Sequence, residues 1–157
     1  YGLAKSIGIS NNEAQEFIDK YFETYPGVRE YMNYEKEFVS LHGYVETIFG
    51  RKRYLTTELM SPNFQIREFA QRAAINQPLQ GTAADLIKMA MIEVEKQIEN
   101  RKMKTKMIMQ VHDELIFELP KEELEPLKEL VLQAMELGQP LKVPLVVDIN
   151  HGTSWKE

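Results

Sequence analysis

The feature that most constrains the fold of this chain is a pair of short apolar runs that flank a polar segment. Residues 107–109 and 115–117 are apolar, and residues 110–114 between them read Gln-Val-His-Asp-Glu. Short runs of bulky side chains with polar boundaries are typical of strands. The pattern therefore predicts a β-hairpin whose connection carries a histidine and two carboxylates.

This connection lacks the residues that hairpin turns usually use. Such turns favour Asn-Gly, Asp-Gly or other glycine-containing pairs because these tolerate a positive φ, and the segment contains no glycine. The neighbouring carboxylates of Asp113 and Glu114 should repel each other unless a divalent cation with oxygen ligands lies between them. We interpret both residues as part of a magnesium site. The alternative is a solvated acidic turn with an incidental His112.

Size and composition limit the classes of protein that this chain can represent. Its 157 residues, 43% of them hydrophobic, are enough for one core or two small ones. The absence of cysteine excludes disulfides and thiolate metal sites, so any metal is held by oxygen or imidazole. A net charge of −5 means that a nucleic-acid surface must be local. No membrane span or signal peptide is visible. Because the chain begins at Tyr1, we expect it to be the C-terminal piece of a longer protein.

Two helices are predicted in the first part of the chain. Ser10 and Glu13 have the spacing of a capping box, and apolar residues recur on one face from residue 14 to 22. We expect this helix to bury its aromatic side chains. A second helix is predicted from Pro26 to Gly43. The short connection suggests that the two helices pack antiparallel.

A basic segment follows these helices. Residues 44–49 are rich in β-forming side chains and lead into Gly50-Arg51-Lys52-Arg53, after which Tyr54 and Leu55 are expected to return as a partner strand. Three basic side chains on a glycine-led turn suit contact with phosphate. The alternative is a basic turn that is merely solvated.

A further helix is predicted from Ser61, and polar residues recur along it. Arg72, Asn76 and Gln80 are four residues apart, a spacing that gives hydrogen-bond donors on one face. Every base pair offers acceptors in the DNA minor groove, so these donors suit that groove, although a solvated polar stripe is the alternative. Pro78 should kink or break this helix. We expect Gly81 to open another, largely buried helix that ends near residue 100.

The last part of the chain completes the predicted fold. A helix is expected from Pro120 to Gly138, and residues 143–149 have the composition of a final strand. Helix, hairpin, helix and strand in this order predict an α+β fold with a small antiparallel sheet covered by helices on one face.

Two longer strings and several shorter ones resemble family A DNA polymerases. The long strings are residues 72–85 and 110–114, and residues 1–4, 44–53 and 152–155 agree as well. The resemblance is to the C-terminal part of the polymerase domain and covers essentially the whole chain. It implies an α+β fold with a small antiparallel palm sheet packed on helices, together with helices of the fingers subdomain. Residues 1–60 would be the fingers remainder with the basic hairpin, and residues 61–157 the palm.

The resemblance also implies a reaction and a set of catalytic groups. Members of the family transfer a nucleotide from a dNTP to the 3′-hydroxyl of a primer under the direction of a template, in DNA replication and repair, with two Mg²⁺ ions. Asp113 would be a metal ligand, Glu114 a second carboxylate at the metals, and His112 a contact to the primer end.

The same resemblance implies that further residues contact DNA or nucleotide. Tyr1 would stack near the templating base, and Gly2 would leave room beside it. Arg51 would contact the DNA backbone, and the minor groove would be lined by Arg72, Asn76 and Gln80. The expected partners are primer-template DNA, dNTP and the upstream remainder of the polymerase chain, with no membrane. The family implies a cytoplasmic, nucleoid-associated protein, and an organellar or phage origin stays open.

The family's other metal-binding aspartate and its triphosphate-binding lysine and arginine lie upstream of Tyr1. We therefore expect these 157 residues to be inactive by themselves, with only half of the metal ligands. The main alternative is a catalytically inactive DNA-binding module. A metal-dependent nuclease would not need the row of minor-groove donors, and a purely structural helical domain would not need Asp113 and Glu114.

Overall fold

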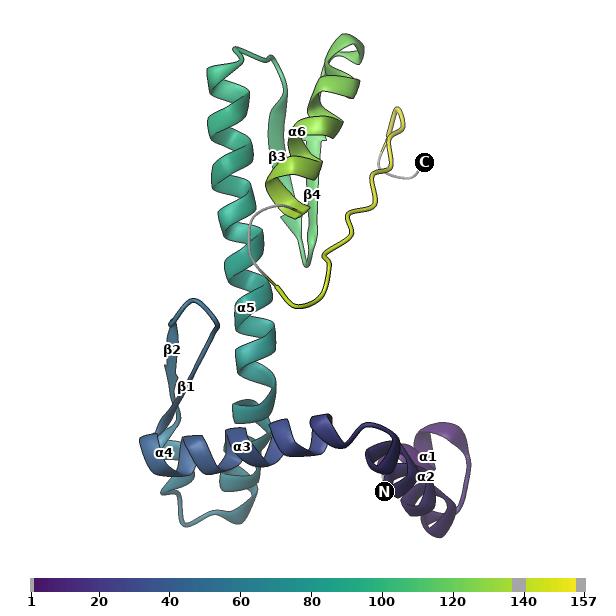
Figure 1. Cartoon of the computed structure of the whole chain (residues 1–157), viewed down its shortest axis with the longest axis vertical. Helices are drawn as coiled ribbons and strands as arrows, with labels where there is room; N and C mark the ends of the chain where they lie inside the picture. The colour runs from purple at the N-terminus through teal and green to yellow at the C-terminus, as the bar shows by residue number, and fades with distance from the viewer. Residues whose placement is uncertain (1, 137–140, 155–157) are drawn as a thin grey trace. The chain divides into compact units, whose positions relative to one another are not determined.

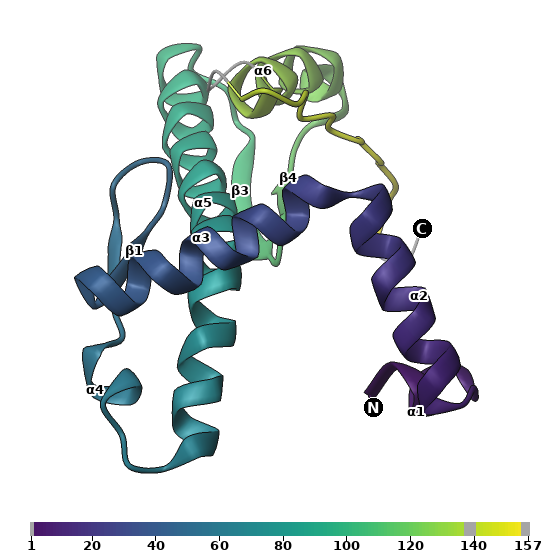
Figure 2. The same cartoon turned by 60° about the horizontal axis from the view of Figure 1, so that its bottom comes forward.

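The computed structural model describes residues 2–136 and 141–154, so Tyr1, Gly138 and Trp155 lie outside the described part. The chain forms two compact units, Tyr1–Leu79 and Gln80–Glu157, and each is considered by itself below. The fold is α+β, as predicted, and Figures 1 and 2 show its elements. In chain order they are α1 (Gly2–Ile7), α2 (Asn11–Thr24), α3 (Pro26–His42), β1 (Tyr44–Glu46), β2 (Lys52–Tyr54), α4 (Thr56–Leu59), α5 (Phe64–Asn100), β3 (Lys106–Val111), β4 (Glu114–Glu118), the 3₁₀ turn η1 (Lys121–Glu123) and α6 (Leu124–Glu136). No helix in the described part is long and apolar enough to cross a membrane.

The predicted signals at the ends of α2 and α3 are confirmed. Ser10 accepts a hydrogen bond from the backbone N–H of Glu13 at 3.2 Å, and the Ser10 N–H donates to the Glu13 carboxylate at 2.9 Å. Helix α3 begins with Pro26 and ends at Gly43, whose φ is +74°. A Cβ on Gly43 would lie 2.5 Å from Oγ1 of Thr56, so both the backbone conformation and the available space require glycine.

The predicted antiparallel packing of α2 and α3 is wrong. Figures 1 and 2 show that the two helices meet at an angle where the chain passes Tyr25. Ala14 is buried, but Phe17 is 61% exposed and Tyr21 is 43% exposed, so the expected burial of the α2 aromatics is also wrong. The rings contact one another instead, with 5.4 Å between the centroids of Tyr21 and Phe22. A sequence pattern shows which face is apolar, but not whether another element covers it.

The hairpin after α3 is confirmed but is shorter than predicted. Strand β1 pairs antiparallel with β2, and Tyr44 lies opposite Tyr54. Residues 47–51 form the turn, in which Oγ1 of Thr47 accepts hydrogen bonds from two backbone N–H groups. Lys52 and Arg53 belong to β2, so only Arg51 of the three basic residues lies in the turn. The prediction that the turn carries all three basic residues is therefore wrong.

The core of the first unit joins α3, the hairpin and the start of α5. Val39, Val45, Leu55 and Ala74 are fully buried and form one cluster. Ala74 has a small side chain, which allows the backbone of α5 to approach the other elements closely. The position of residues 73–77 of α5 therefore depends on contacts with segments that are distant in the sequence.

Of the kink or break predicted at Pro78, the break does not occur, since α5 is continuous there, and the predicted separate helix at Gly81 is wrong. Proline has no N–H, so the usual hydrogen bond to the carbonyl four residues earlier is lost, and the ring strains the neighbouring carbonyls. The acceptor that loses its partner is the carbonyl of Ala74, yet α5 continues through Pro78. The hydroxyl of Tyr31 donates to the next carbonyl along the helix, that of Ile75, at 2.9 Å.

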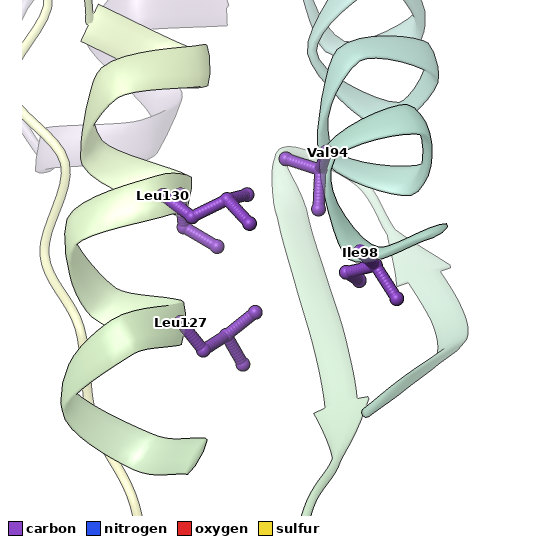
Figure 3. Packing of buried hydrophobic residues seen from close by; sticks show 5 residues of the cluster. Val94, Ile98, Leu127 and Leu130 are labelled. Atoms are coloured by element: carbon purple, nitrogen blue, oxygen red, sulfur yellow. The ribbon is translucent and has the colours of Figure 1, made fainter. Parts of the chain in front are cut away.

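The second unit contains the β3–β4 hairpin, covered on one face by helices as predicted. Val94 and Ile98 of α5 contact Leu127 and Leu130 of α6, as Figure 3 shows. Met107 of β3 and Phe117 of β4 pack against the same cluster. An irregularity between Met107 and Met109 leaves Ile108 54% exposed.

Two predictions for the second unit are wrong. The C-terminal half of α5 is not largely buried, because its buried residues follow one stripe and Ile92 is 70% exposed. Residues 143–149 form no strand. Val146 is 79% exposed, and the N–H of Val147 donates to the side chain of Glu136 at 3.0 Å instead of to a neighbouring strand. Alternating apolar residues form a strand only beside a partner edge that accepts the ladder.

Glu123 of η1 forms hydrogen bonds with the residues just before β3. Its carboxylate accepts hydrogen bonds from the N–H groups of Lys104 and Thr105, both at 2.8 Å, and from the hydroxyl of the buried Thr105 at 2.6 Å. These bonds favour the charged form, with the Lys104 N–H as the largest cause, and they lower the pKa of Glu123.

We predict that Glu123→Gln speeds the amide hydrogen exchange of Lys104 and Thr105 in the full-length protein at pH 7. A lowered folded-state pKa stabilises the fold above the ordinary glutamate pKa of about 4.3, and this stabilisation is lost as the pH falls through the folded value. The difference between the native protein and the variant should therefore narrow below about pH 4. Glu122→Gln, on the exposed neighbour, is the control. Equal exchange in the native protein and in Glu123→Gln at pH 7 would contradict the assignment.

Candidate functional site

The tip of the β3–β4 hairpin is a two-residue loop under conformational strain. Val111 lies opposite Glu114, so His112 and Asp113 form the loop, and the predicted hairpin is confirmed. The φ of His112 is +52°, a value that favours glycine at the first loop position. The side-chain amide of Gln110 donates to the carbonyl of His112 and holds the loop. A non-glycine residue in this conformation costs about 1 kcal/mol or more, and such strain concentrates at functional sites.

The carboxylates at this tip face solvent. Asp113 and Glu114 are both exposed, as is His112. Within the described residues, no group of three histidine, aspartate or glutamate side chains is close enough to hold a metal ion. Mg²⁺ is usually bound through one or two carboxylates, with water and substrate phosphates completing its six ligands. The hairpin tip thus fits part of a magnesium site and offers hard oxygen ligands to it.

Arg72 and Asn76 lie on the exposed side of α5 in the first unit. The buried Ala74 belongs to the opposite side of the helix and packs into the core. Gln80, the first residue of the second unit, is the next four-residue step along the same helix and is also exposed. All three side chains thus retain hydrogen-bond donors that can reach a ligand.

The other predicted DNA contacts lie elsewhere in the first unit. Arg51 is exposed in the β1–β2 turn, where its N–H donates to Oγ1 of Thr47 at 3.3 Å and its carbonyl accepts from the Thr47 N–H at 3.0 Å. Gly2 is the first residue of α1 and is exposed. Tyr1 lies outside the described residues. The structure brings His112, Asp113 and Glu114 together in one loop, whereas Arg51 and Gly2 belong to separate elements.

Two residues near the row of donors were missed at the sequence level. Tyr31 contacts the backbone of α5 through its hydroxyl, and Arg53 donates from Nη1 to Oε1 of Gln77 at 2.6 Å. Tyr31 appears in the sequence only as one more aromatic on the apolar face of α3, and Arg53 only as part of a basic run. No spacing rule links residues that are 44 and 24 positions apart.

The remaining basic residue of the hairpin is held by an aromatic ring. Nζ of Lys52 lies 4.1 Å from the ring centroid of Tyr44. A hydrogen bond to Tyr44, the largest cause, raises the pKa of Lys52 and keeps it charged. Within the hairpin, Arg51 thus lies at the turn and Lys52 contacts the ring of Tyr44, whereas Arg53 contacts Gln77 of α5.

The whole sequence, residues 1–157, matches the family described as DNA polymerase family A. The chain is 48% identical over 157 residues to DNA polymerase I of Caldicellulosiruptor bescii and 48% identical over 155 residues to DNA polymerase I of Bacillus subtilis. These matches include 100% and 99% of this chain, respectively, but the chain spans only 18% of the length of each relative.

Among solved structures, the fold resembles the POL domain of Pol1 from M. smegmatis in complex with DNA primer-template and dNTP. The TM-score is 0.94 at 44% identity, over 99% of this chain and 27% of that one. A sequence match over every residue and a structural match of this quality lead to the same assignment. This chain belongs to DNA polymerase family A.

Proposed function

We propose that this chain is part of a DNA-directed DNA polymerase that adds nucleotides from dNTPs to a primer 3′-hydroxyl in DNA replication and repair. The observation that carries the proposal is the hairpin tip, where a strained two-residue loop presents the exposed carboxylate of Asp113 beside that of Glu114. Strain of this kind concentrates at functional sites, and it supports a role for this loop.

In this proposal Asp113 and Glu114 would supply carboxylate oxygens to Mg²⁺. The bound metal would activate the primer hydroxyl and stabilise the charge that develops on the triphosphate. His112, in the same loop, would contact the primer end. The hairpin would bring these three side chains to one place, and positioning is the main contribution that a protein makes to phosphoryl transfer.

Arg72, Asn76 and Gln80 would donate hydrogen bonds to acceptors in the minor groove of the newly formed duplex. These acceptors occur at every base pair, so the contacts would test pair geometry without reading sequence. Arg51 would contact the DNA backbone, and Tyr1 and Gly2 would lie near the templating base. A complex of a related Pol1 domain with DNA primer-template and dNTP supports DNA and nucleotide as partners.

We further propose that residues 1–60 belong to the fingers and residues 61–157 to the palm. The chain spans 18% of the length of the relatives that it matches, so activity would belong to the complete polymerase and not to these residues alone. A polymerase that acts on the bacterial chromosome would work in the cytoplasm at the nucleoid.

We predict that Asp113→Asn in the full-length polymerase lowers Mg²⁺-dependent primer extension by about 10³-fold or more, because loss of a metal ligand removes several kcal/mol of transition-state stabilisation. Binding of primer-template should survive. Glu118→Gln, an exposed carboxylate at the far end of β4, is the control and should extend normally.

Normal extension by Asp113→Asn would contradict the metal role. A native protein that binds primer-template but never extends it would favour the alternative of an inactive DNA-binding module.

The minor-groove role predicts a specific response to a modified primer. Replacing N3 of the terminal purine with C–H removes an acceptor, so extension by the native polymerase should slow by about 2- to 10-fold, the value of one hydrogen bond. Arg72→Ala or Asn76→Ala should reduce this sensitivity, because the donor is then absent. Equal sensitivity in the native enzyme and in both variants would exclude the proposed contacts.

Because the loop is strained, we predict that a substitution of His112 by glycine affects stability and activity differently. His112→Gly should leave the free energy of unfolding unchanged or raise it by up to about 1 kcal/mol, while primer extension falls. Lys102→Gly is a matched control, since Lys102 has a φ of +54° at the end of α5. It should relieve similar strain without loss of extension. Normal extension by His112→Gly would show that the histidine side chain has no role.

A further inference from the structure

The turn of α5 that carries Asn76 lacks one backbone hydrogen bond. Pro78 follows two residues later and removes a backbone hydrogen bond from the turn. Asn76 itself is exposed, so packing of its own side chain does not fix its position. If Asn76 reads the minor groove, something else must hold the backbone beneath it.

Two contacts from distant elements meet this turn on either side of Asn76. The hydroxyl of Tyr31 on α3 donates to the carbonyl of Ile75 at 2.9 Å, and Nη1 of Arg53 on β2 donates to Oε1 of Gln77 at 2.6 Å. The residues immediately before and after Asn76 are thus each bonded to a different element of the first unit.

The elements that supply these contacts are themselves fixed to α5. Val39 of α3, Val45 of β1 and Ala74 of α5 are fully buried in one cluster. Burial, with a smaller effect from the charge of Glu35, raises the pKa of Tyr31 to about 12, so its hydroxyl stays protonated and able to donate at physiological pH.

We propose that Tyr31 and Arg53 are positioning residues for Asn76, holding residues 75–77 of α5 so that the Asn76 amide meets the minor groove in a fixed orientation. The proposal rests on the polymerase function proposed above. It assigns to Arg53 a contact within the protein instead of one with DNA phosphate.

The test is the discrimination between matched and mismatched primer ends, measured as the ratio of kcat/KM for their extension by the full-length polymerase. Asn76→Ala should lower this ratio by about 2- to 10-fold, the value of one hydrogen bond. Tyr31→Phe and Arg53→Met should each lower it in the same direction. In the Asn76→Ala background neither substitution should have a further effect, because residues that act through one group are non-additive.

Matched controls separate positioning from general destabilisation. Tyr34→Phe removes a hydroxyl from an exposed tyrosine of α3, and Arg29→Met removes an arginine that contacts the ring of Phe22. Both should leave the discrimination ratio unchanged. A variant that is merely less stable would lower extension of both primers together and leave their ratio intact.

Each outcome bears on the proposal. If Asn76→Ala lowers discrimination but Tyr31→Phe and Arg53→Met do not, or if their effects add fully to that of Asn76→Ala, the positioning role is wrong while the minor-groove function stands. If Asn76→Ala itself leaves discrimination unchanged, the minor-groove contact of Asn76 is wrong, and the positioning role fails with it, while the contacts of Arg72 and Gln80 are tested separately.

Discussion

Pro78 removes one backbone hydrogen bond from α5, and contacts from other elements of the first unit meet the helix just before it. The hydroxyl of Tyr31 donates to the Ile75 carbonyl, and Ala74 is fully buried in one cluster with Val39 and Val45. Because the helix is continuous, Arg72 and Asn76 lie on its exposed side, about one turn apart. The presentation of the donors thus depends on a few contacts made from other elements.

Local signals in the sequence predicted local structure well. The capping box of Ser10 and Glu13, the end of α3 at Gly43 and the β3–β4 hairpin are each determined by a few neighbouring residues, and all are confirmed. In each case the physical cause lies within a few residues, where a sequence pattern can express it.

The wrong predictions concern contacts between distant segments. Tyr31 bonds to α5 from 44 positions before Ile75, and Phe17 is exposed because α2 and α3 meet at an angle. Residues 143–149 have the composition of a strand but pair with no other strand in the described part of the chain. For the candidate site, the residue types were recognisable from sequence, while the groups that hold them, such as Arg53 and Thr47, emerged only from the structure.

We propose above that Asp113 is a metal-binding carboxylate of a DNA polymerase, and the other proposed roles at the hairpin tip depend on it. The most direct measurement is a crystal structure of the full-length protein with primer-template, a non-hydrolysable dNTP analogue and Mn²⁺, with the metal located by its anomalous scattering. The account predicts a Mn²⁺ peak within about 2.0–2.3 Å of an Asp113 carboxylate oxygen. A complex in which primer-template and nucleotide are bound but no metal lies at Asp113 would contradict it.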